Sequence, residues 1–216
     1  MKKVNLTNKK TVISAIALSA VMAVGGAMAY FTDIDSAKNQ IEIGNVHIDL
    51  TEPKWDETPD ENNNGIPDTA EKIVPGKTIE KDPMVTNTGK NDSYIYLTVS
   101  VPKADIITAA PDGTLNNNGE ASTTQLFSYT ANKNWELLET DSSADDKNVY
   151  VYGYKTAVAP GASTDTLFDS VTFVNAIEGQ GLEDKVFDID INASAIQSEE
   201  TGTMKEAYKK FINQNS

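Results

Sequence analysis

The sequence has no cysteine and no arginine, and its single histidine is His47. Without cysteine the chain forms no disulfide and performs no thiol chemistry, so its stability depends on packing. One histidine cannot build a zinc protease site, which takes two histidines and a glutamate. A serine triad would have to use His47, yet the chain contains no Gly-x-Ser-x-Gly turn. With 32 acids some glycosidase-like pair is always available, so such pairs carry almost no signal. We therefore expect a protein that is not an enzyme.

Positive charge is scarce as well, because 18 lysines stand against 32 acids and give a formal net charge of −14. A surface of this sign repels polyanions, so nucleic acid and anionic membranes are poor candidate partners. The acidity is typical of a protein that must stay soluble outside the cell. It is also compatible with cation binding.

Residues 1–29 have the pattern of a signal peptide. Lysines at 2, 3, 9 and 10 precede the apolar run "TVISAIALSAVMAVGGAMA", and Ala27 and Ala29 are the small residues of a cleavage site. The alternative is a retained membrane anchor, since the run approaches a span of about 20 residues. The break at Gly25 and Gly26 favours removal, which leaves a mature chain of 187 residues (216 minus 29) that begins at Tyr30.

The mature chain, residues 30–216, reads as one all-β domain. Apolar and polar residues alternate with period two in runs rich in Val, Ile, Tyr, Phe and Thr, between clusters of Asn, Asp, Gly and Pro. The predicted strands cover residues 40–50, 78–88, 93–101, 125–130, 134–139, 148–156, 166–174 and 186–196. Short strands with frequent turn signals favour a jelly-roll-like β-sandwich.

A short C-terminal helix is predicted in "TMKEAYKKFINQ". Thr203 and Glu206 have the spacing of a capping box, which marks the start of a helix. Its apolar stripe consists of Met204, Ala207, Tyr208, Phe211 and Ile212. We expect this stripe to pack on the sandwich rather than to bind a ligand.

Residues 60–71, "DENNNGIPDTAE", fit the spacing of a calcium-binding loop. The ligand positions are occupied by Asp60, Asn62, Asn64, the carbonyl of Ile66, Asp68 and Glu71, with Gly65 at the sharp turn. The run "NNNGIPD" also resembles the calcium loops of thrombospondin-type repeats. The alternative is a hydrophilic linker, since Asn, Gly and Pro form turns without metal. Two asparagines in place of aspartates lower the ligand charge, so we expect weak calcium binding, on the order of 10⁻⁴ to 10⁻³ M.

The segment "SAVMAVGGAMAYFTDIDSAKNQIEIGNVHIDL" strongly resembles the amino-terminal region of the TasA and camelysin (CalY) family of Gram-positive bacteria. Weaker similarity follows in "VPGKTIEKDPMVTNTGKNDSYIYLTVSVP", "APGASTDTLFDSVTF" and "FDIDINASAIQ". The resemblance implies cleavage by a SipW-type signal peptidase and export to the cell surface or extracellular matrix. It also implies a jelly-roll domain that assembles into fibres of the biofilm matrix, alone or with an accessory matrix protein. Camelysin has been classed as a metalloprotease, but this chain has no recognisable zinc site.

The residues that directly follow the cleavage site suggest a mechanism for fibre assembly. Residues 30–43, "YFTDIDSAKNQIEI", can form a strand once cleavage frees their end, and that strand can add to an open sheet edge of a neighbouring subunit. Tyr30, Phe31 and Ile34 would then be the assembly residues, with Phe31 and Ile34 filling pockets. The alternative is that the segment is the first strand of its own sandwich. A different function also stays open: a monomeric, calcium-dependent module for binding or adhesion at the cell surface.

Overall fold

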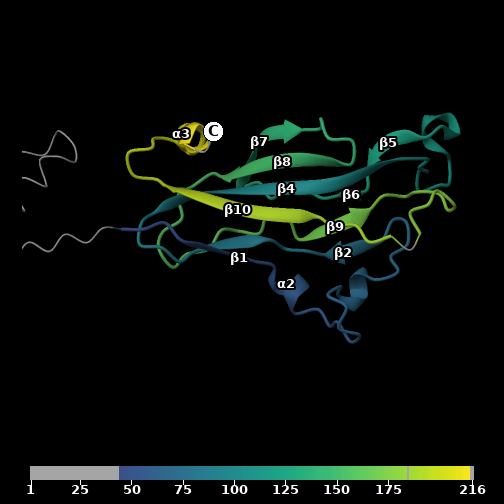
Figure 1. Ribbon diagram of the computed structural model, residues 1–216, viewed down its shortest axis with the longest axis horizontal. Helices are drawn as coiled ribbons and strands as arrows, with labels where there is room; N and C mark the ends of the chain where they lie inside the picture. The colour runs from purple at the N-terminus through teal and green to yellow at the C-terminus, as the bar shows by residue number, and fades with distance from the viewer. Residues whose placement is uncertain (1–43, 184, 215–216) are drawn as a thin grey trace, which may run out of the picture. The chain divides into compact units, whose positions relative to one another are not determined.

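Figure 1 shows the computed structural model, which describes residues 44–183 and 185–214. The predicted signal peptide with Ala27 and Ala29, and the predicted donor strand with Tyr30, Phe31 and Ile34, lie outside the described residues. Within the described ranges, no helix has the length and apolar character needed to cross a membrane.

One layer is an antiparallel sheet built on the long strand β4 (Ser93–Ile106). The sheet order is β10 (Asp190–Gln197), β4, β8 (Lys147–Tyr154) and β7 (Trp135–Asp141), and β5 (Ser122–Gln125) pairs with the far end of β4. Every second side chain of β4 faces the core, so that Ile95, Leu97, Val99 and Val101 are fully buried. This inward alternation is why β4 can serve as the central strand.

The facing layer contains β1 (Ile48–Thr51) paired with β3 (Met84–Asn87), and β2 (Thr78–Glu80) paired with β9 (Ser170–Phe173), which also pairs with β6 (Phe127–Ser128). The predicted strand over 78–88 is therefore interrupted. Pro83 has no backbone N–H to donate to a ladder, which explains why regular pairing fails there. The two parts still run beside one neighbour, because Lys81 N donates to the Asp169 carbonyl at 3.3 Å and Thr86 forms a bridge with Ser163.

The two layers enclose a continuous core, in which Phe168, Leu167 and Leu126 lie against the β4 side chains. The structure thus confirms the predicted all-β, jelly-roll-like sandwich with a short C-terminal helix. Other strand bounds differ from the prediction: β1 begins at residue 48, β9 covers only 170–173, β10 begins at 190, and the predicted strand 125–130 divides into β5 and β6 at Leu126.

The C-terminal helix α3 (Met204–Gln214) packs on the outer face of the first sheet (Figure 1). Its predicted capping box is present, since Thr203 N donates to Glu206 Oε2 at 2.8 Å and Glu206 N donates to Thr203 Oγ1 at 3.4 Å. Met204 approaches β8 at Gly153, where a Cβ would lie 2.3 Å from the Met204 sulfur. A side chain at position 153 would therefore require Met204 to move.

Three short helical turns complete the description. They are α2 (Pro53–Asp56), the 3₁₀ turn η1 (Asp68–Ala70) and the 3₁₀ turn η2 (Asn116–Gly119). The first two lie in the connection between β1 and β2, which contains the predicted calcium loop.

Candidate functional site

A cleft opens where both layers lose a strand partner. β4 pairs with β10 over residues 93–100 and with β5 over residues 103–106, so residues 185–189, which precede β10, have no place on β4. In the facing layer, β1 pairs only with residues 84–87, and β2 has a partner strand on one side only among the described strands. The result is a cleft of about 680 Å³ between β2 and the segment before β10.

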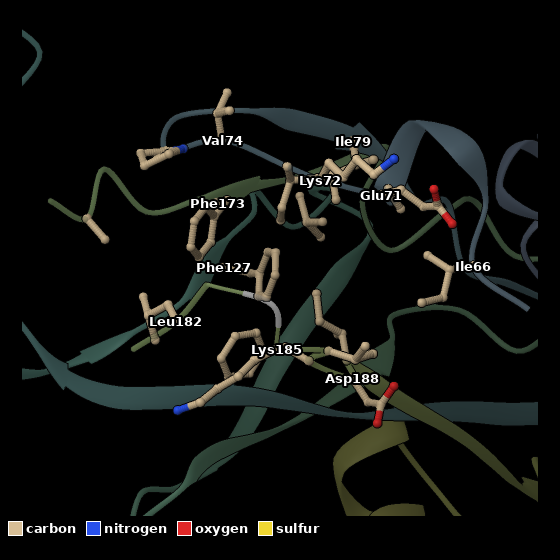
Figure 2. Close-up of a pocket in the computed structure, with 18 of the residues that line it drawn as sticks. Ile66, Glu71, Lys72, Val74, Ile79, Phe127, Phe173, Leu182, Lys185 and Asp188 are labelled. Atoms are coloured by element: carbon tan, nitrogen blue, oxygen red, sulfur yellow. The ribbon is translucent and has the colours of Figure 1, made fainter. Parts of the chain in front are cut away.

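The cleft is mainly apolar. Its inner surface is formed by the buried side chains of Ile79, Phe127, Val171 and Phe173. Figure 2 shows the Phe127 and Phe173 rings in the middle of the cleft, with Ile79 on one side and Leu182 and Lys185 on the other. The two ring centroids are 5.5 Å apart. An opening of this size between two sheet edges is suited to a partner that brings apolar side chains and a backbone.

Two valines at the mouth of the cleft expose most of their surface: Val74 is 62% exposed and Val186 is 68% exposed. Isolated surface valines need no explanation, but two at one apolar opening add to the apolar surface that the cleft exposes. Charged side chains also line the cleft, among which Glu71, Lys72 and Asp188 are labelled in Figure 2. This combination of an apolar centre and a polar border is typical of binding surfaces.

The backbone at the cleft includes an open sheet edge. Phe173 N donates to the Lys77 carbonyl and Lys81 N donates to the Asp169 carbonyl, so residues 77 and 81 direct their backbone groups toward the strand that contains β9. Because alternate residues of a strand point their backbone groups to opposite sides, those of Thr78 and Glu80 face the other side, where no described strand pairs with β2. An added strand would find its hydrogen-bonding partners there.

A buried ion pair forms one end of the cleft. Lys81 Nζ lies 2.7 Å from Glu52 Oε2, with 9% and 16% of the two side chains exposed, and 4.5 Å from the centre of the Trp55 ring. Glu52 Oε1 is buried and has no hydrogen-bond partner in the described part of the chain. Loss of one partner of such a pair leaves a buried charge, which typically costs about 3–5 kcal/mol. The pair therefore fixes the turn α2, and Trp55 with it, against β2.

The predicted calcium loop borders the same cleft, because Gly65, Ile66 and Glu71 contribute to its lining. The Asp60 carboxylate accepts hydrogen bonds from Asn64 N at 3.2 Å and from Gly65 N at 2.8 Å. Glu71 Oε1 accepts from the side-chain amides of Asn62 at 2.7 Å and Asn64 at 2.6 Å. These contacts draw the first, third, fifth and twelfth positions of the loop around one point.

The two remaining candidate ligands are Asp68 and Ile66, which form hydrogen bonds of their own within the loop. Asp68 Oδ1 accepts from Glu61 N at 3.3 Å, and Asp68 is the first residue of η1. Ile66 is half-buried, and its amide donates to Asn64 Oδ1 at 2.8 Å. Gly65 has a φ of +84°, which only glycine adopts easily and which the sharp turn of the loop requires.

The donor set fits a hard cation, since all six candidate ligands offer oxygen. A cation at the centre would take the place of the two asparagine amides as the partner of Glu71, and the amides would then turn their oxygens inward. Those amides hydrogen-bond to Glu71 and keep the pKa of its carboxyl below its usual value, with a smaller contribution from Lys72. The carboxylate is therefore ionised at neutral pH. A cation could bind here only in exchange for these existing hydrogen bonds.

In residues 44–183 and 185–214, no three His, Asp or Glu side chains are grouped in a way that could hold a metal ion. The three acidic residues of the candidate loop, Asp60, Asp68 and Glu71, do not form such a group. His47 is exposed and lies just before β1, where its carbonyl accepts from Thr88 N. It is not grouped with other candidate ligands in this part of the chain.

The cleft itself was not predicted from the sequence. The sequence pattern that accompanies the cleft is weak. The segments "KIVPGK" and "KVFDID" each contain a pair of apolar residues near charged residues, but this arrangement is also common in ordinary strands. The buried Lys81–Glu52 pair was missed for a similar reason, because nothing local distinguishes a lysine that turns inward at an interrupted strand.

Comparison with known proteins gave no match to a family model, a curated protein or a solved structure.

Proposed function

We propose that this chain is a secreted, non-enzymatic structural protein that forms extracellular fibres by head-to-tail strand addition. The observation that supports this most directly is the apolar cleft beside the open edge of β2. The donor is the segment 30–43, freed by cleavage after Ala29, and the acceptor is the cleft of a neighbouring subunit. A contact between two different surfaces of the same chain does not close on itself, so repetition gives a filament.

The direction of β1 favours insertion into a neighbour. Ile48 pairs with Asn87 and Thr51 with Met84, and residues 45 and 47 continue this line away from β2 by accepting hydrogen bonds from Lys90 and Thr88. Asn45 and Glu80 thus lie beyond opposite ends of β3. Followed back from β1, the described chain therefore runs from residue 47 to residue 44 away from the cleft.

The donor would enter with one face inward. Successive side chains of a strand point to opposite faces, so Phe31, Asp33 and Asp35 share one face and Tyr30, Thr32 and Ile34 share the other. Phe31 and Ile34 therefore cannot both fill pockets of one cleft, contrary to the expectation above. A regular strand on the open edge of β2 turns only one of them toward Ile79 and the interior of the cleft. The other residue of the pair would lie on the outer face of the assembled sheet.

The resemblance described above extends this proposal to export, a SipW-type peptidase, the surface or matrix of a Gram-positive bacterium, and an accessory matrix protein as a further partner. We expect the exported protein to begin at Tyr30 and to form filaments. Amino-terminal sequencing and electron microscopy of the protein purified from culture supernatant check both. A chain that keeps residues before Met28, or a mature protein that stays monomeric at every concentration, would contradict the proposal.

A second candidate function, a calcium-dependent surface binding module, has its own supporting observation. The candidate calcium loop contributes Ile66 and Glu71 to the wall of the cleft, so a cation bound in the loop would act directly on that wall. In this alternative the cleft receives a ligand of another kind, and the protein acts as a monomer.

Both readings share a calcium prediction. We expect the mature protein to bind Ca²⁺ at roughly millimolar levels, and Glu71→Ala to abolish most of the response because it removes a bidentate, charged ligand. Isothermal titration calorimetry of both proteins measures this, and Glu61→Ala is the matched control, since Glu61 lies in the same loop and is not a candidate ligand. Equal heats for the parent protein and the Glu71 variant would show that the loop is a linker. Protons compete for Glu71 only at pH values below its lowered pKa, so binding should be constant near neutral pH.

A further inference from the structure

The tetrapeptide Asn-Asn-Asn-Gly occurs twice in this chain, at residues 62–65 and 116–119. Each copy ends in an asparagine followed by glycine, Asn64-Gly65 and Asn118-Gly119. Glycine has no Cβ, so its backbone nitrogen can approach the preceding side-chain amide closely. The tetrapeptides are identical and only their flanking residues differ, so a difference between the two copies that arises on folding comes from the fold.

The first copy is held at every group that would have to move. Asn64 Oδ1 accepts from Ile66 N at 2.8 Å, and Asn64 Nδ2 donates to Glu71 Oε1 at 2.6 Å. The Gly65 N–H donates to Asp60 Oδ2 at 2.8 Å. An attack of the Gly65 nitrogen on the Asn64 amide carbon would break these bonds before any new bond formed.

The second copy is held far less. Asn118 is exposed, and its side chain has no hydrogen-bond partner within the described residues, 44–183 and 185–214. Asn117 and Asn118 have φ values of 49° and 55°, two consecutive residues in the left-handed region, where residues other than glycine pay a conformational cost. The first copy also contains a left-handed asparagine, Asn63 with a φ of 58°, so the two copies differ mainly in the contacts of the side chain: the Asn118 amide is free to rotate and the Asn64 amide is held.

We propose that Asn118 is a site of spontaneous deamidation in the folded protein and that the loop contacts protect its twin, Asn64. The Gly119 nitrogen attacks the Asn118 side-chain carbon and loses its proton, and the amide nitrogen leaves as ammonia. Water then opens the resulting succinimide ring at one of its two carbonyls, which gives aspartate or isoaspartate. The reaction needs only water and adds one negative charge.

The position of Asn118 determines the consequence. None of residues 107–121 contributes to the lining of the cleft, so a change at Asn118 is compatible with assembly. The same reaction at Asn64 would convert a neutral candidate ligand into a carboxylate and would remove a donor to Glu71. The fold thus allows the reaction where it has little effect and prevents it where it would alter the candidate cation loop.

The test follows both sites in one sample. The mature protein is incubated in mildly alkaline buffer, with and without denaturant, and the peptides that contain Asn64 and Asn118 are quantified by mass spectrometry. In denaturant we expect similar rates. In the folded protein we expect Asn118 to deamidate almost as fast as in denaturant. Asn64 should deamidate at least about tenfold more slowly than in denaturant, since several hydrogen bonds must first break.

The Glu71→Ala variant tests the cause. We expect this variant to raise the deamidation rate of Asn64, whose side-chain amide loses Glu71 as its hydrogen-bond partner. The deamidation rate of Asn118 should not change. Comparable slowing of both sites on folding, or equal rates at both sites in the folded protein, would overturn the proposal. An unchanged Asn64 rate in Glu71→Ala would show that the loop contacts do not provide the protection.

Discussion

Removal of residues 30–37 from the mature protein is expected to abolish filament formation while the domain melts close to the parent temperature. The reason is that the proposed donor leaves, whereas every described strand of the sandwich begins at residue 48 or later. Light scattering and electron microscopy measure assembly, and thermal melting measures the fold. If the segment is instead the first strand of its own sandwich, the same deletion uncovers apolar surface and lowers the melting temperature.

Two point variants refine this expectation without shortening the chain. Phe31→Asp and Ile34→Asp each place a charge on one face of the donor, and burial of an unpaired charge costs on the order of several kcal/mol or more. Because the two side chains lie on opposite faces of a regular strand, we expect one variant to stop assembly and the other to assemble nearly as the parent protein does. Filaments from the truncated protein would refute strand addition by this segment.

The general fold could be predicted because it depends on local alternation. Ile95, Leu97, Val99 and Val101 already mark the buried face of β4 in the sequence, and the pair Thr203 and Glu206 already marks the start of α3. The ends of the strands were less predictable where hydrogen-bonded pairing with a neighbour, rather than the alternation of apolar and polar residues, determines where a strand begins. The run before β10 alternates as a strand does from residue 186, but β10 begins only at Asp190, because β5 occupies the end of β4.

The candidate site divides in the same way. The calcium-loop spacing could be recognised because its residues are contiguous, and hydrogen bonds within the loop connect Asp60, Asn62, Asn64 and Glu71. The cleft could not be recognised from the sequence. It forms because β2 and the segment before β10, which are far apart in the chain, each lack a strand partner among the described strands. Such an opening has no sequence pattern of its own, and only the three-dimensional arrangement places Phe127 beside Phe173 in the cleft.

The second large effect concerns the acceptor. The double variant Val74→Asp, Val186→Asp is expected to remain a folded monomer that does not form filaments. Both side chains are largely exposed, so their replacement changes stability by no more than about 0.5 kcal/mol each. An incoming apolar strand, however, would have to cover two new charges at the mouth of the cleft. Leu137→Asp is the matched control, because Leu137 is 49% exposed on β7 and does not line the cleft.

A mixture of the two defective proteins gives the sharpest result. The truncated protein keeps its cleft and lacks a donor, whereas the double variant keeps its donor and has a blocked cleft. Head-to-tail addition therefore allows one productive contact between them and no second one, so we expect dimers with one copy of each and no filaments. Analytical ultracentrifugation or mass photometry measures the species formed. Filaments from the double variant alone would show that the cleft is not the acceptor. If each protein stays monomeric alone and the mixture also contains no dimer, the donor and this cleft are not partners, even if the parent protein polymerises.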